Sequence, residues 1–170
     1  MKRFFLIGYM GSGKTTTGRR LAKKYNLNFI DLDSYIERRY LKTISQLFQE
    51  KGEDGFRKIE HALLQEVAEF ENIIISTGGG TACFYDNLEL MNQKGETVYL
   101  KASAAELASY LSSPLAKNRP LLSGKNEDEL LNFITETLEK REPFYSKAKH
   151  TINARDMSDE LFDEMLLLKE

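Results

Sequence analysis

Short apolar runs recur along the chain, separated by longer segments that mix apolar and charged positions. Continuous runs of this length, bounded by polar or turn-forming residues, are typical of buried strands. The candidate strands are FFLIG (4–8), NFIDLD (28–33), NIIISTG (72–78), ETVYLK (96–101) and HTINA (150–154). Because strands that are apolar throughout are buried on both faces, these runs predict a sheet with a layer on each side.

The segments between the apolar runs have helical spacing or composition. They cover residues 15–27, 34–52, 53–70, 104–111, 128–148 and 158–170. In segment 53–70 the apolar positions recur in steps of three and four and form one stripe, with Arg57 and Glu60 together on a neighbouring face. Strands that alternate with helices predict an α/β fold, a three-layer αβα arrangement with a parallel sheet. Ligands of such folds bind at the carboxyl ends of the strands.

The composition of the chain mainly excludes classes of protein. The 170 residues, 41% hydrophobic and 29% charged, predict a single soluble domain over residues 1–170. A net charge of -2 argues against a dedicated nucleic-acid binder. The lone Cys83 excludes an intramolecular disulfide and fits a reducing cytoplasm. The apolar start is too short for a secretion signal and no segment approaches a membrane span, so we expect a cytoplasmic protein without membrane contact.

A glycine-rich turn follows the first apolar run directly. Its residues 8–15, GYMGSGKT, match the G-x-x-x-x-G-K-[ST] pattern of a phosphate-binding loop, the Walker A motif. Glycines let backbone N–H groups converge on phosphates, the lysine adds charge and the threonine hydroxyl can ligate Mg²⁺. The predicted ATP-binding residues are Gly11, Ser12, Gly13, Lys14, Thr15 and Thr16. An ordinary strand-to-helix turn is the plainer alternative, and the motif alone does not separate GTPases, motors, kinases and nucleotide sensors.

Two carboxylates, Asp31 and Asp33, end the second apolar run. Alternation along a strand would point them to opposite sides, so that they serve different partners. Beside a triphosphate, one fits a place near Mg²⁺ and the other fits a role in holding or deprotonating a hydroxyl nucleophile. Asp33 with Ser34 also fits a helix cap.

Three consecutive glycines, Gly78, Gly79 and Gly80, follow the third apolar run at the same predicted edge of the sheet. Three residues without side chains indicate a close approach to a ligand, although a flexible turn is the alternative. No acidic residue ends this strand, so Asp31 is the nearest carboxylate for Mg²⁺.

Three arginines stand out as candidate anion ligands: Arg57, Arg119 and Arg141. The guanidinium fork suits carboxylate and phosphate, although any one arginine taken singly also fits a solvated surface. Arg119 lies in a long irregular stretch, residues 112–124, which we expect to be a lid that brings this cation to the transferring phosphate.

With these motifs in view, the chain resembles shikimate kinase over roughly residues 3–154. The stretches that carry the resemblance are GYMGSGKTTTGRRLA, FIDLD, GEDGFRKIE, STGGG, RPLL and KREPFY, in that order. The resemblance implies a P-loop NTPase fold of the nucleoside-monophosphate-kinase type with a five-stranded parallel sheet. It also implies an ATP site with Mg²⁺, acceptor-binding helices at about residues 33–70 and a closing lid at about 112–124.

The resemblance further implies a role for individual residues. Asp33 would hold the shikimate hydroxyls, and the arginines 57 and 141 its carboxylate, with Glu60 positioning the first. The glycines 78–80 would contact the ring through their backbone. Thr15 would ligate Mg²⁺ and Asp31 would lie near it, with Lys14 and Arg119 as the phosphate cations. The expected catalytic residues are Lys14, Asp33 and Arg119.

The implied activity is that of an ATP:shikimate 3-phosphotransferase in aromatic amino-acid biosynthesis, acting on ATP and shikimate. A related kinase for another hydroxy acid, such as gluconate, and a non-catalytic ATP-binding regulatory module are the alternatives. Many family members carry an arginine near Tyr110 that packs on adenine, so here Tyr110 is a candidate to stack on the base. A monomer is the expected state because the site is small and self-sufficient.

Overall fold

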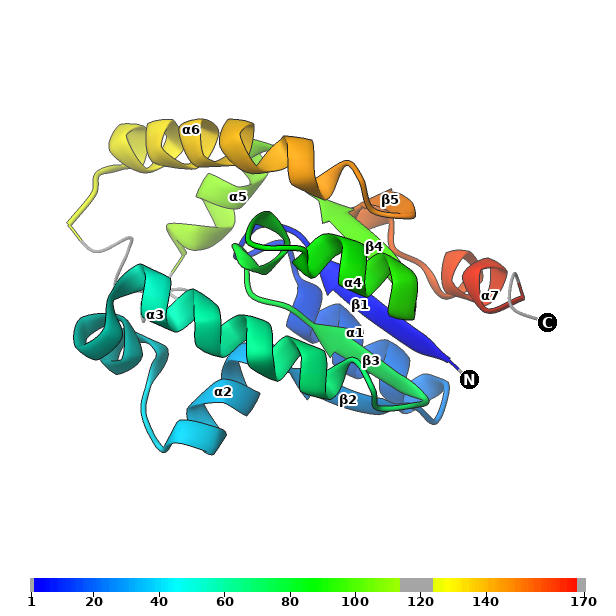
Figure 1. Ribbon diagram of the computed structural model, residues 1–170. Helices are drawn as coiled ribbons and strands as arrows, with labels where there is room; N and C mark the ends of the chain where they lie inside the picture. The colour runs from blue at the N-terminus through cyan, green and yellow to red at the C-terminus, as the bar shows by residue number, and fades with distance from the viewer. Residues whose placement is uncertain (1, 114–123, 168–170) are drawn as a thin grey trace.

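A five-stranded parallel sheet forms the centre of the protein (Figure 1). The computed structural model describes residues 2–113 and 124–167. The strand order is β2-β3-β1-β4-β5, and the strands are β1 Arg3–Ile7, β2 Asn28–Asp31, β3 Ile73–Ser76, β4 Glu96–Lys101 and β5 His150–Asn153. All pairings are parallel. The predicted strands and the α/β class are therefore confirmed.

Helices cover both faces of the sheet (Figure 1). On one face, α1 (Lys14–Lys24) and α7 (Asp159–Leu167) pack with Phe4 and Leu6 of β1 in one apolar cluster. On the other face, α2 (Leu32–Tyr40), α3 (Ile44–Val67) and α4 (Asn87–Lys94) pack with Phe5 and Ile7 in a second cluster. Side chains of one strand alternate between the two cores, as the two-residue period of a strand requires.

A third apolar cluster supports the end of the sheet where β1 leads into the glycine-rich turn. Tyr9 of that turn packs against α5 (Ala104–Leu111) and α6 (Glu127–Tyr145). These helices stand above the turn, opposite α2 and α3 (Figure 1). No helix of the described residues is long and apolar enough to cross a membrane.

The predicted helix over 34–52 is wrong as a single element. Leu41 adopts a left-handed conformation (φ 53°) that ends α2, and Thr43 then caps α3 through a reciprocal capping box with Gln46. Within α3 the backbone leaves helical geometry at Gly52 (φ 68°, ψ 179°). The break at Gly52 coincides with the predicted boundary between segments 34–52 and 53–70. Helical composition continues through Leu41, so periodicity alone did not reveal the break between α2 and α3.

Helix α4 was absent from the predicted elements. Its sequence NLELMNQK is short and mostly polar, and it buries Asn87, Leu88 and Met91. So few apolar positions over two turns give almost no periodic signal, and the helix depends on its tertiary contacts.

Candidate active site

The glycine-rich turn joins β1 to α1 and closes around the first turn of the helix. Gly11 and Gly13 have positive φ values of 83° and 88°, which residues with a Cβ rarely adopt. Lys14 opens the helix and is 7% exposed. Its Nζ donates to the carbonyl oxygens of Gly8 at 2.7 Å and Tyr9 at 2.9 Å. The turn thus presents backbone N–H groups and a buried ammonium group at the N-terminus of a helix, an arrangement that suits a phosphate.

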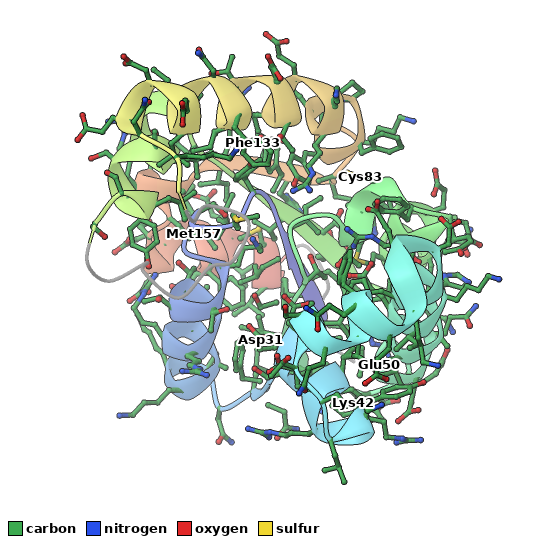
Figure 2. All side chains as sticks on the ribbon, turned by 90° about the vertical axis from the view of Figure 1, so that its left-hand side faces the viewer. Asp31, Lys42, Glu50, Cys83, Phe133 and Met157 are labelled. Atoms are coloured by element: carbon green, nitrogen blue, oxygen red, sulfur yellow. The ribbon has the colours of Figure 1, made fainter. Side chains whose placement is uncertain are left out.

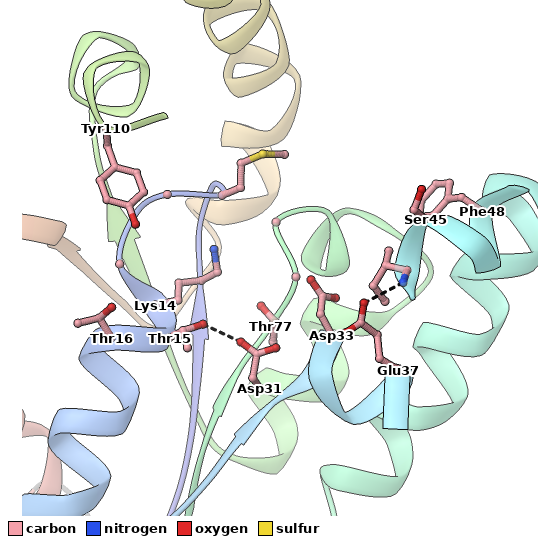
Figure 3. A pocket seen from close by; sticks show the side chains of 16 residues that line it. Lys14, Thr15, Thr16, Asp31, Asp33, Glu37, Ser45, Phe48, Thr77 and Tyr110 are labelled. Carbon is pink, nitrogen blue, oxygen red and sulfur yellow. Dashed lines mark hydrogen bonds between the residues drawn. The ribbon is translucent and has the colours of Figure 1, made fainter. Parts of the chain in front are cut away.

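Thr15 and Asp31 are in direct contact beside this turn. The Thr15 hydroxyl donates to Asp31 Oδ2 at 2.6 Å (Figure 3). It also lies 3.4 Å from the Ser76 hydroxyl. Hydroxyl and carboxylate oxygens are the ligands that Mg²⁺ prefers, usually together with water and phosphate oxygens. No group of three or more His, Cys, Asp or Glu side chains suited to a metal occurs among the described residues. The Thr15 hydroxyl and the Asp31 carboxylate are donors of the kind that Mg²⁺ binds.

The expected arrangement of the two aspartates is wrong. Strand β2 ends at Asp31, whose Oδ1 accepts the N–H of Ser34 at 3.0 Å and caps α2. Asp33 lies in the first turn of α2 instead of continuing the strand, and the helix cap is Asp31. Both carboxylates line the same cavity, because the change from strand to helix replaces the two-residue alternation (Figure 3).

A cavity of about 610 Å³ extends from the glycine-rich turn toward α2 and α3. Asp31 lines this cavity, and in Figure 2 it lies between α1 on one side and α2 with α3 on the other. Its lining comprises Met10, Gly11, Gly13, Lys14, Thr15, Thr16, Asp31, Asp33, Glu37, Ile44, Ser45, Phe48, Thr77, Gly78, Gly79 and Tyr110. The expected convergence of three strand ends at one site is confirmed, and the volume is that of a small-molecule site.

Each glycine of the triple-glycine loop Gly78–Gly80 faces a different polar side chain. A Cβ on the first would lie 3.0 Å from Asp33 Oδ1, and on the second 3.1 Å from Arg141 Nη1. On the third it would lie 2.5 Å from Arg57 Nη2. The loop thus leaves room for one carboxylate and two guanidinium groups to approach the backbone, which a flexible turn does not require.

The two arginines near this loop, the buried Arg57 and the half-buried Arg141, are incompletely paired. Arg57 Nη1 donates to Glu60 Oε1 at 2.9 Å, so the predicted proximity of these side chains on α3 is confirmed. Among the described residues, however, the buried Arg57 Nε and Arg141 Nη1 have no hydrogen-bond partner. An unpaired buried donor on a cation costs free energy unless a ligand satisfies it. The pair of arginines is therefore suited to an anion.

Asp33 is partly buried close to other acidic groups. Burial, together with the charges of Glu60 and Asp31, raises the pKa of its carboxyl to about 6, while Lys14 and Arg57 oppose the shift. A carboxylate with a pKa near neutrality is both ionised at pH 7 and able to accept a proton from a reacting hydroxyl.

The structure describes only part of the segments expected at the end of the cavity that contains the glycine-rich turn. Arg119 and most of segment 112–124 lie outside the described residues. Tyr110 is 45% exposed and lines the cavity next to Gly11. Arg155 pairs with Glu106 at 3.1 Å and lines a second hollow that also includes Gly11.

Several lining residues were not predicted individually. Glu37, Ser45 and Phe48 form the wall opposite the glycine-rich turn (Figure 3), within the helices expected to bind an acceptor. Tyr145, which ends α6, is fully buried, and its hydroxyl donates to the carbonyl oxygen of Gly79. The sequence signal for Tyr145 was its closeness to Arg141 in the KREPFY stretch.

Comparison with known proteins places the chain and its fold in a family. The family model described as shikimate kinase matches residues 10–168. The chain belongs to the shikimate kinase family. A shikimate kinase from Parabacteroides distasonis is 58% identical over 161 residues, which cover 94% of this chain and 92% of that protein.

Solved shikimate kinases have the same fold. The structure from Bacteroides thetaiotaomicron has a TM-score of 0.87 and 50% identity, and the match covers 99% of this chain and 96% of that one. A shikimate kinase from Acinetobacter baumannii, solved in complex with shikimate, has a TM-score of 0.86 and 34% identity, covering 99% and 95% of the two chains. The shikimate kinase assignment thus extends over the whole described fold.

Proposed function

We propose that this protein transfers the γ-phosphoryl group of ATP to the 3-hydroxyl of shikimate. The observation that carries the proposal is the meeting of two half-sites in one cavity. The phosphate-binding turn lines one end of the cavity, and the partly buried Asp33 with Gly78 and Gly79 lines the other. Arg57 and Arg141 do not line the cavity, but they lie against the triple-glycine loop and are incompletely paired. Membership of the shikimate kinase family supports the same reaction.

The acceptor half of the site matches the chemistry of a hydroxylated carboxylate. Arg57 and Arg141 offer their unpaired N–H groups to the shikimate carboxylate. Asp33 accepts a hydrogen bond from the reacting hydroxyl and takes its proton as phosphoryl transfer proceeds. The backbone of Gly78–Gly80 lies close to the ring because no side chain intervenes.

The donor half holds the triphosphate. Backbone N–H and hydroxyl groups of residues 11–16 donate hydrogen bonds to the phosphates. Lys14 gives up its hydrogen bonds to the loop carbonyls and binds the β- and γ-phosphates instead. Thr15 and Asp31 would hold Mg²⁺, the former directly and the latter through water. When bound, Mg²⁺ neutralises charge on the phosphate oxygens and orients them.

Arg119 completes the proposed catalytic set. It belongs to the proposed lid at residues 112–124, and its assignment depends on the RPLL stretch and the family resemblance. A cation that stabilises charge on the transferring phosphoryl group contributes mainly to the rate. We therefore expect Arg119→Ala to lower kcat by about 10²- to 10³-fold, whereas a change confined to the KM for shikimate would remove this role.

The proposed functional unit is a single kinase domain that acts as a cytoplasmic monomer. All residues of the proposed site come from one chain, so assembly is not needed to complete it. Sedimentation equilibrium of the purified protein tests this state, and a stable dimer at assay concentration would contradict it.

Substrate profiling tests the proposed reaction. Production of ADP is measured with ATP and Mg²⁺ alone, and then with shikimate, gluconate or nucleoside monophosphates added. We expect turnover with shikimate only. ADP release with another acceptor would retain the phosphate site and overturn the acceptor assignment, while ligand binding without turnover would favour a regulatory module.

A further inference from the structure

The segment that follows the triple-glycine loop contacts the Arg57–Glu60 pair at two separate points. Thr81 opens a short 3-10 turn, Thr81–Cys83, and is fully buried. Its hydroxyl donates to Glu60 Oε2 at 2.8 Å. Glu60 is 1% exposed, and its other oxygen, Oε1, accepts from Arg57 Nη1 at 2.9 Å. Glu60 is therefore held by Thr81 on one side and holds Arg57 on the other.

Phe84 makes the second contact, with the guanidinium group itself. The Arg57 Cζ lies 4.2 Å from the centre of the Phe84 ring, compared with 5.3 Å for Phe56 and 5.9 Å for Phe48. Gly80 lies against the same guanidinium, since a Cβ there would be 2.5 Å from Nη2. A ring this close restricts the tilt of a guanidinium group and stabilises its charge.

Asn87 fixes this segment to the rest of the fold. Its side chain donates to the carbonyl oxygen of Thr81 at 2.9 Å and pairs with His61 Nδ1 at 2.6 Å. Asn87 is fully buried, and His61 belongs to α3, the helix that also carries Arg57. The turn is thus tied to the helix whose arginine it contacts.

These contacts decide which edge of Arg57 is available to a ligand. Nη1 is engaged by Glu60, whereas Nε has no partner in the described part of the chain. The nearest carboxylate to Nη2 besides Glu60 is that of the exposed Glu53 at 3.6 Å, beyond hydrogen-bond distance. The Nε–Nη2 edge therefore remains for a carboxylate, and paired bonding to it requires the guanidinium plane to be fixed.

We propose that Thr81 and Phe84 are positioning residues for the acceptor carboxylate, Thr81 through Glu60 and Phe84 by stacking on Arg57. The inference rests on the proposed function, in which Arg57 binds that carboxylate. On this inference, the turn after the triple-glycine loop influences acceptor preference although it does not touch the acceptor itself.

The test compares shikimate with its neutral carboxamide analogue as acceptors. The variants are Thr81→Val, which removes the hydroxyl at similar volume, and Phe84→Leu, which removes the ring. For each, the KM for shikimate should rise about tenfold, which corresponds to about 1.4 kcal/mol. The kcat and the KM for ATP should stay within about twofold of the parent protein. The kcat/KM for the carboxamide should hardly change, so the preference for the carboxylate falls.

Matched variants separate positioning from packing. Thr81→Ser and Phe84→Tyr keep the hydroxyl and the ring, so each should restore the KM of the parent protein. Thr135→Val and Phe133→Leu serve as controls on α6. Thr135 donates to a helix carbonyl and Phe133 stacks 4.9 Å from Lys125, so neither contacts Arg57 or Glu60. Both controls should leave acceptor preference unchanged.

Three outcomes overturn the inference. They are an unchanged KM for shikimate in Thr81→Val and Phe84→Leu, an equal loss for both acceptors, and failure of the conservative variants to restore binding. Failure of the proposed function would give results different from these three. It would appear as no shikimate turnover by the parent protein, or as an unchanged shikimate KM in Arg57→Ala.

Discussion

Replacing Asp33 by asparagine should stabilise the protein and inactivate it. The carboxyl is partly buried near Glu60 and Asp31, which raises its pKa from 3.8 to about 6. At 1.36 kcal/mol per pKa unit, with a reduction for solvent contact, ionised Asp33 costs the folded state about 2 to 3 kcal/mol at pH 8. Because the pKa is raised on folding, this cost is absent below pH 3.8 and develops as the pH rises through about 6.

The assay is denaturant unfolding of the ligand-free parent and Asp33→Asn proteins at pH 4.5 and pH 8. The variant should gain about 2 to 3 kcal/mol at pH 8 but only about 1 kcal/mol at pH 4.5. Asp54→Asn, on an exposed position of α3, is the control and should change stability by less than about 0.5 kcal/mol at either pH. A loss of stability in Asp33→Asn at pH 8, or a gain independent of pH, would refute the reasoning.

Activity gives the complementary result for the same variant. Asp33→Asn should bind ATP normally and lose nearly all turnover, because an amide cannot accept the proton of the reacting hydroxyl. Near-normal turnover would remove Asp33 from that role, even if the stability prediction held.

Three further changes test other parts of the site. Lys14→Met should lower kcat by about 10²-fold or more because the cation at the transferring phosphate is lost; steady-state kinetics that show only a raised acceptor KM would contradict this. Gly80→Ala places a methyl group against Arg57, so the KM for shikimate should rise with little change in the KM for ATP, measured by varying each substrate. Tyr145→Phe leaves the carbonyl of Gly79 without its hydroxyl donor, and urea unfolding should show a loss of about 1 to 2 kcal/mol. Unchanged stability would show that this hydrogen bond contributes nothing net.

The strands and the phosphate-binding turn are predictable from sequence for a physical reason. A parallel strand covered on both faces is a continuous apolar run, and a turn that binds phosphate through its backbone needs glycine at defined spacings. Both signals are local. The site at the ends of β1, β2 and β3 follows from them, because parallel strands bring their carboxyl ends to one edge.

The details that the sequence did not reveal have different physical causes. Strand β2 ends at Asp31 because Asp31 caps α2. Asp33 therefore lies on a helix and not on the strand, and both aspartates line the same cavity. The contacts of Thr81 and Phe84 with the Glu60–Arg57 pair join residues more than 20 positions apart, and no spacing rule in the sequence reports them. Helix α4 is too short and polar to show periodicity.

Phosphorus NMR of one competition reaction tests the central claim most directly. The purified protein, ATP and Mg²⁺ are incubated with equal amounts of shikimate and gluconate, and the phosphate ester formed is identified by its coupling to the ring protons. The account predicts a single ester on the 3-hydroxyl of shikimate. Gluconate phosphate, an ester at another shikimate hydroxyl, or release of inorganic phosphate alone would contradict it.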